Sequence, residues 1–180
     1  MKGLFTLVAA AAMAAPVLSQ TALPPEPCLH FQTRFSVVIH APYAETAPLF
    51  GPIAEGAWLG SFWSPKFIYP QPAKDVEGAV FTTSDGKLTT VWINTLFDLD
   101  ARHIHYVHIV PELELETIDL RFTSIDSATT QVDAVFTRTA LTTQGNEHVA
   151  RMSKEDQERG ETWRQAIGNY LASLKSGQPR

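Results

Sequence analysis

Alternation of apolar and polar residues over a series of short segments is the feature that most constrains this fold. In residues 31–40 the odd-numbered positions include Phe31, Phe35 and Ile39, and most residues between them are polar. The same alternation returns in residues 80–83, 88–98, 102–110, 115–125 and 130–141. A period of two is typical of a strand with one buried face. Short turns join the later segments, including Asp85-Gly86, a strong hairpin signal. The sequence therefore predicts an antiparallel meander.

One long amphipathic helix is predicted after the strands. Its apolar face comprises Trp163, Ile167, Tyr170, Leu171 and Leu174. Ser153 is the predicted N-cap, and Gly177 lies beyond the C-terminal end. Gly160 lowers helix propensity and indicates either a bend or the close approach of another group. A helix so apolar on one side must be covered, and we expect it to pack into the concave face of the sheet.

Between the first strand and the meander, residues 42–59 are predicted to form two short helices. Pro42 suits the first position of a helix, whereas Pro48 and Pro52 exclude one long helix across this stretch. Three prolines in residues 65–72 predict irregular backbone or an edge strand.

Residues 1–19 have the pattern of a signal peptide. Lys2 supplies the positive charge, and residues 4–17 form an apolar core shorter than the roughly 20 residues of a membrane span. We expect cleavage after Ser19, hence a periplasmic or secreted protein with no stable membrane insertion afterwards; an uncleaved anchor is the alternative. The proline-rich residues 20–30 are predicted to be a flexible lead-in to one ligand-binding domain at 31–175.

Composition excludes some function classes. The formal net charge of −5 argues against a nucleic-acid partner, which would need a basic surface. Cys28 is the single cysteine, so no disulfide forms within the chain. The chain has no phosphate-binding glycine loop and no His-Glu-x-x-His motif, and no cofactor is expected. We expect a monomer or weak dimer.

A strand, two short helices, six strands and a long C-terminal helix resemble the START-like (SRPBCC) superfamily. The resemblance rests on residues 35–42, 78–83, 139–142 with Gly145, and 163–171. It implies an α+β helix-grip fold, with a curved antiparallel sheet of about seven strands around the C-terminal helix. It also implies an internal cavity that binds or transports a hydrophobic small molecule or lipid. The alternative that it implies is a cyclase, dehydratase or hydrolase acting on an aromatic or apolar substrate in the same cavity.

The predicted ligand-binding residues combine apolar strand and helix positions, aromatic residues near the cavity mouth, and a few polar groups. They are Trp58, Trp63, Tyr69, Phe81, Asn94, Phe122, Phe136, Arg138, Trp163 and Tyr170. Arg138 is interpreted as an outward-facing arginine that pairs with Asp119, or else as a group that meets a ligand carboxylate at the cavity end.

The histidines of residues 102–110 are the best chemical lead. His103 and His105 share one strand face and could start a metal site, but too few ligands surround them, so an ordinary exposed face is preferred. Tyr106 and His108 share the opposite face. If that face is inward, they could hydrogen-bond a polar ligand head or act as acid and base. They are the candidate catalytic residues.

Overall fold

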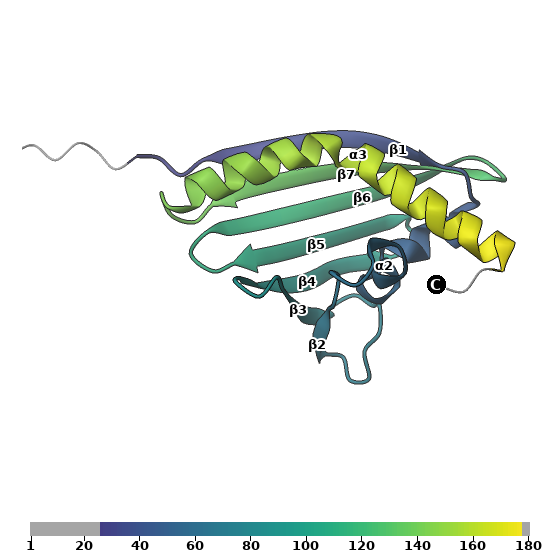
Figure 1. Cartoon of the computed structure of the whole chain (residues 1–180), viewed down its shortest axis with the longest axis horizontal. Coiled ribbons are helices and arrows are strands. Elements are labelled where there is room, and N and C mark those ends of the chain that lie inside the picture. The colour runs from purple at the N-terminus through teal and green to yellow at the C-terminus, as the bar shows by residue number, and fades with distance from the viewer. Residues whose placement is uncertain (1–25, 178–180) are drawn as a thin grey trace, which may run out of the picture.

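The computed structural model describes residues 26–177, which form one sheet, a group of short helices and one long helix (Figure 1). The elements are β1 (His30–Ile39), α1 (Tyr43–Thr46), the 3-10 helix η1 (Ala47–Phe50), α2 (Pro52–Leu59), β2 (Lys66–Tyr69), β3 (Val80–Ser84), β4 (Thr89–Asp98), β5 (His103–Val110), β6 (Glu114–Asp126), β7 (Thr129–Ala140) and α3 (Gly145–Ser176).

The seven strands pair in the order β1-β7-β6-β5-β4-β3-β2, and every pair is antiparallel. Strands β2 to β7 are neighbours in chain order, as the hairpin signals predict, and β1 closes the sheet beside β7. Helix α3 lies across the sheet along β1 and β7 (Figure 1). The predicted helix-grip fold is therefore confirmed.

Period-two burial defines the inner face of the sheet. In β7 the even-numbered side chains are buried from Thr130 to Ala140, and in β5 those of Ile104, Tyr106, His108 and Val110 are buried. A half-buried strand has this pattern because successive side chains point to opposite faces.

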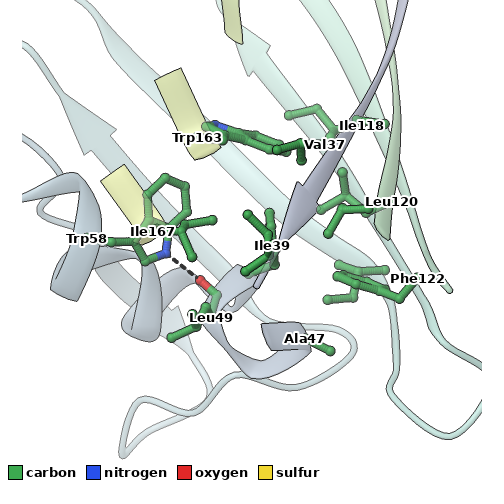
Figure 2. Packing of buried hydrophobic residues seen from close by; sticks show 14 of the residues in the cluster. Val37, Ile39, Ala47, Leu49, Trp58, Ile118, Leu120, Phe122, Trp163 and Ile167 are labelled. Carbon is green, nitrogen blue, oxygen red and sulfur yellow. Dashed lines mark hydrogen bonds between the residues drawn. The ribbon is translucent and has the colours of Figure 1, made fainter. Parts of the chain in front are cut away.

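The apolar core lies between this inner face and α3. Figure 2 shows Trp163 and Ile167 of α3 facing Val37 and Ile39 of β1, and Leu120 of β6 belongs to the same cluster. Ile167 and Leu120 are fully buried. The core thus forms where the apolar stripe predicted for the helix meets apolar side chains of the inner sheet face.

The short helices close one end of the core. Trp58 of α2 is buried, and its indole Nε1–H donates a 2.7 Å hydrogen bond to the carbonyl of Leu49 (Figure 2). The first turn of α2 is capped from a distant loop: Asp75 accepts hydrogen bonds from the backbone N–H of Ile53 (2.8 Å) and of Ala54 (3.3 Å). This carboxylate satisfies N–H groups that otherwise have no partner inside the helix.

The predicted N-terminus of the last helix is wrong. Helix α3 begins at Gly145, and Ser153 is a buried residue in its interior. Val149, Ser153 and Asp156 are all buried at helical spacing, so the buried face extends N-terminally past the apparent cap. Tertiary burial of this turn outweighs the local preference of serine for a cap position.

Gly160 marks a close approach, one of its two predicted roles. A Cβ atom at this position would lie 2.9 Å from Cδ2 of Phe35, which packs against Trp163 with ring centroids 5.3 Å apart. The helix can rest on β1 here because glycine has no side chain.

The predicted signal peptide, its cleavage after Ser19 and most of the lead-in lie outside the described residues. The end of the lead-in is tied to α3, because Asn146 accepts a hydrogen bond from the backbone N–H of Leu29 (2.8 Å). Cys28 is exposed and has a free thiol. Within residues 26–177 no helix has both the length and the apolar character needed to cross a membrane.

Candidate functional site

A cavity of about 1000 Å³ lies between the inner face of the sheet, the segment after α2, and α3. Its residues come from positions 55–64, from β3 to β7, and from the N-terminal half of α3. The lining includes Trp58, Trp63, Phe81, Thr90, Trp92, Tyr106, His108, Glu114, Glu116, Ile118, Phe136, Arg138, His148, Arg159 and Trp163.

One wall of the cavity is aromatic. The rings of Phe81 and Trp92 stack with centroids 5.8 Å apart, and Trp63 meets the Trp92 ring edge-on at 5.5 Å. Trp63 is held by a 2.7 Å hydrogen bond from its Nε1–H to the carbonyl of Pro52. Aromatic rings fixed in this way present flat apolar surface at little cost in side-chain entropy.

The strand register continues this aromatic wall into a polar row. Trp92 of β4 pairs with His108 of β5, His108 with Glu116 of β6, and Glu116 with Arg138 of β7. Side chains directly opposite each other on neighbouring strands lie close together on the same face. Four consecutive strands therefore place an aromatic ring, an imidazole, a carboxyl and a guanidinium side by side on the inner face.

Arg138 is the centre of a buried ion-pair network. Its Nε donates to Asp156 Oδ2 (2.5 Å) and its Nη2 to Asp156 Oδ1 (2.9 Å). Nη1 pairs with Glu114, and Nη2 lies 2.6 Å from Glu116 Oε1. These four side chains are at most 2% exposed. Buried charges are stable only when paired, so the three carboxyl groups are what allow an arginine here.

Two further groups complete the network. Arg159 Nε lies 3.1 Å from Asp156 Oδ1, and His148 Nε2 lies 2.7 Å from Glu114 Oε2. The predicted outward orientation of Arg138 and its pairing with Asp119 are wrong. Asp119 lies on the outer face of β6 and pairs with His103 (2.6 Å). Arg138 and Phe136 are two residues apart in β7, so both side chains lie on the inner face of the sheet. The ion pairs of the network offset the free-energy cost of burying the charge of Arg138.

His108 is buried with no hydrogen bond to either ring nitrogen from any group within residues 26–177. Its Nε2 lies 3.2 Å from Glu116 Oε2, and the Trp92 ring packs edge-on against it at 4.2 Å. Burial lowers the pKa of His108 to about 3, and the positive charges of Arg138 and Arg159 act in the same direction. A neutral imidazole therefore faces the cavity at neutral pH.

The pKa of Glu116 shifts in the opposite direction to that of His108. Burial raises the pKa of its carboxyl well above the usual value, although Arg138 opposes this rise. Burial therefore favours the neutral, protonated form of this carboxyl group.

Tyr106 has a structural partner. Its hydroxyl donates a 2.6 Å hydrogen bond to the carbonyl of Phe50 in η1, and burial raises the pKa of the phenol well above its usual value. Because the hydroxyl donates its proton to this bond, Tyr106 connects η1 to β5 beneath the cavity.

The predicted site residues fall into two groups. Those that line the cavity are Trp58, Trp63, Phe81, Tyr106, His108, Phe136, Arg138 and Trp163. The other four lie elsewhere: Tyr69 is 60% exposed on the edge strand β2, Asn94 donates to the backbone carbonyl of Val76 (3.1 Å), and Phe122 and Tyr170 belong to the core or pack against it. Their role in ligand binding stays a prediction.

His103 and His105 share the outer face of β5, as predicted. His103 Nε2 lies 2.6 Å from Asp119, and His105 Nδ1 lies 2.5 Å from the hydroxyl of Thr95. Within residues 26–177 the side chains grouped closely enough to hold a metal ion are instead His108, Glu114 and Glu116.

Sequence reasoning missed Glu114, Glu116 and Asp156. The two glutamates continue the parity of Ile118 and Leu120 toward the start of β6, so the alternation pointed to their inward orientation. Asp156 has no comparable local signal, because an acidic residue near a presumed helix start is normally explained by the helix dipole.

No family model and no curated protein matches this sequence. Solved structures match its fold. The crystal structure of Ara h 8.0201 is 12% identical with a TM-score of 0.56, over 80% of this chain and 99% of that chain. Norcoclaurine synthase from Thalictrum flavum, solved in complex with dopamine and hydroxybenzaldehyde, is 9% identical with a TM-score of 0.58, over 90% and 99%. A protein from Rhizobium leguminosarum is 12% identical with a TM-score of 0.56, over 81% and 97%. The chain shares the helix-grip fold of these proteins.

Proposed function

We propose that this protein binds an apolar, aromatic small molecule or lipid in the cavity, with a polar group of the ligand directed at His108. The observation that carries the proposal is the composition of the cavity: an aromatic wall continues, through the strand register, into a buried imidazole with no hydrogen-bond partner within residues 26–177. Ligand sites are typically apolar pockets of about 300–1,000 Å³ with a few convergent polar groups.

The apolar and polar parts of the cavity would act differently. Burial against Trp63, Phe81 and Trp92 would supply affinity, roughly in proportion to the apolar area removed from water. A hydroxyl of the ligand would donate to the neutral imidazole of His108, and this bond would fix its orientation. A ligand without such a group would leave the imidazole unpaired, which costs about 1–3 kcal/mol.

The fold comparisons support the proposed class of ligand. The Thalictrum flavum enzyme with the same fold was solved with two aromatic compounds, dopamine and hydroxybenzaldehyde. We also propose that residues 1–19 export the chain and that the ligand is encountered in the periplasm or outside the cell.

The proposal is tested by native mass spectrometry of protein purified after export, and by titration with anilinonaphthalene sulfonate, an aromatic probe with an anionic head. Thr90→Phe places a ring in the cavity, and Thr123→Phe makes the same change at an exposed position outside it. We expect Thr90→Phe to weaken probe binding about tenfold, because the added ring occupies space in which the probe would contact apolar side chains. Equal binding by both variants would show that the probe lies elsewhere and would refute the proposal.

A catalytic role is the second candidate, favoured by the neutral, unpaired ring of His108 at the cavity surface. Such a ring is in the neutral form that accepts a proton from a bound substrate, as a cyclase, dehydratase or hydrolase requires, but its low pKa makes it a weaker base than an ordinary histidine. His108→Gln should then abolish turnover of an aromatic substrate while preserving probe binding. Turnover that survives this substitution would exclude His108 as the base.

A further inference from the structure

The polar end of the cavity brings three potential metal ligands together. His108 Nε2 lies 3.2 Å from Glu116 Oε2 and 4.0 Å from Glu114 Oε1, and one donor atom from each residue falls within 4.8 Å of the others. Neighbouring ligands of a tetrahedral metal ion with bonds of about 2.0–2.2 Å are separated by similar distances. The three side chains come from adjacent positions on β5 and β6, so the sheet fixes their spacing.

His108 is an independent sign that this cluster receives a ligand. The residue is 8% exposed, and within residues 26–177 neither of its ring nitrogens makes a hydrogen bond. Buried polar side chains are normally paired, and an unpaired one needs an explanation. His108 Nε2 lies 3.2 Å from Glu116 Oε2 without forming a hydrogen bond to it, and a cation bound to both atoms would satisfy both.

The surrounding groups orient the carboxylates without occupying this position. Arg138 Nη2 lies against Glu116 Oε1 (2.6 Å), which leaves Oε2 facing His108. His148 takes Glu114 Oε2 (2.7 Å), so Oε1 is the oxygen directed toward Arg138 and His108. Metal-binding carboxylates commonly have such outer partners, which fix their orientation. Glu114 would share Oε1 with Arg138 and is expected to be the weakest of the three ligands.

We propose that His108, Glu116 and Glu114 bind one divalent transition-metal ion, with a further coordination position open to the cavity. One imidazole and two carboxylates suit Zn²⁺, Co²⁺ or Mn²⁺. Three protein ligands with an open position are typical of a catalytic rather than a structural site. The ion would take His108 Nε2, so in the metal-loaded protein the polar group of the ligand would meet the ion rather than the imidazole, and metal binding itself needs no organic ligand.

The charges of the cluster indicate what would fill the open position. Three carboxyl groups, from Glu114, Glu116 and Asp156, face the two guanidinium groups of Arg138 and Arg159. A divalent ion added to the fully ionised cluster leaves one net positive charge. A carboxylate or phenolate oxygen would neutralise it, and this step rests on the proposed binding function.

The experiment uses the full protein after removal of bound metal with EDTA and dialysis. Zn²⁺ is titrated against a chromophoric chelator, and Co²⁺ is followed by its visible absorption. His108→Phe and Glu116→Gln each remove one ligand, and His105→Phe makes the matched histidine change on the outer face of β5. We expect one Zn²⁺ per chain, affinity lowered about tenfold or more by the first two substitutions, and no change in His105→Phe.

The outcomes distinguish a metal ion on the inner face of β5 from one on its outer face. Loss of binding in His105→Phe with retention in His108→Phe would assign the metal to the outer face and overturn the proposal. If circular dichroism shows that Glu116→Gln does not fold, the proposal is tested by Zn²⁺ binding in His108→Phe and by the Co²⁺ spectrum of the wild-type protein. No visible Co²⁺ bands at one equivalent would overturn the site. Thr90→Phe should retain Zn²⁺, so failure of the organic-ligand proposal would leave the metal result intact.

Discussion

Replacement of Arg138 by methionine tests whether the buried network holds the helix against the sheet. Methionine retains much of the side-chain length but has no charge. In the variant, Asp156 loses hydrogen bonds of 2.5 and 2.9 Å, Glu114 loses its ion pair, and Glu116 loses a contact of 2.6 Å. Removal of one partner from a buried pair leaves the other charge uncompensated, at a cost of about 3–5 kcal/mol.

The remaining contacts place the expected loss near the lower end of that range. Asp156 keeps Arg159 at 3.1 Å, and Glu114 keeps His148 at 2.7 Å. We therefore expect the free energy of unfolding to fall by about 3 kcal/mol at neutral pH. The deficit should shrink at pH 4, because protonation neutralises carboxyl groups that have lost their cation, and folding then takes up those protons.

Urea denaturation followed by tryptophan fluorescence and far-UV circular dichroism measures this loss. The matched control is Arg164→Met, which breaks an exposed pair with Glu161 whose side chains are 52% and 56% exposed. That change should have little effect on stability, because water and salt screen an exposed ion pair. Equal losses in the two variants would refute the reasoning, since burial would then add nothing to the pairing. In the double variant Arg138→Met, Asp156→Leu, part of the loss should be recovered.

Three further predictions concern stability, each checked by the same denaturation. Gly160→Ala should destabilise the protein by about 1–3 kcal/mol, because the new Cβ would lie 2.9 Å from the Phe35 ring. Its control, Gly168→Ala, has nothing within 4 Å and should stabilise the protein by about 0.5–1 kcal/mol. A larger loss in Gly168→Ala than in Gly160→Ala would contradict this packing. Tyr106→Phe should cost about 1–3 kcal/mol by leaving a buried backbone carbonyl without its donor, and a neutral effect would argue against that bond. Asp75→Ala should cost about 1 kcal/mol through loss of the α2 cap; no change would mean that water replaces the carboxylate.

Much of the fold was predictable because its signals are local. The period of two in each strand, the Asp85-Gly86 turn and the prolines of residues 42–59 each act over a few residues, and together they define the meander and the short helices. The start of α3 was not predictable in the same way. Ser153 is a good cap in isolation, yet Val149 and Asp156 are buried against other elements, and that burial extends the helix.

The candidate site was predictable only in part. Alternation shows that Tyr106 and His108 share a face, but β5 carries apolar residues on both faces, including Ile104 on one and Ile109 on the other. Hydrophobicity alone therefore could not select the inner face. Pairing with β4 and β6 selects it, because Trp92 and Ile118 lie opposite the residues of that face.

By itself the sequence determined the order of the elements, the approximate limits of most strands and the antiparallel meander, since periodicity and turn chemistry depend on near neighbours. Only the tertiary structure decided which charged side chains are buried and which are exposed. Arg138 is inward because Glu114 lies 24 residues before it and Asp156 lies 18 residues after it, and both reach the same point in space. A charge is buried or exposed according to whether partners meet it, and packing of α3 against the sheet supplies those partners.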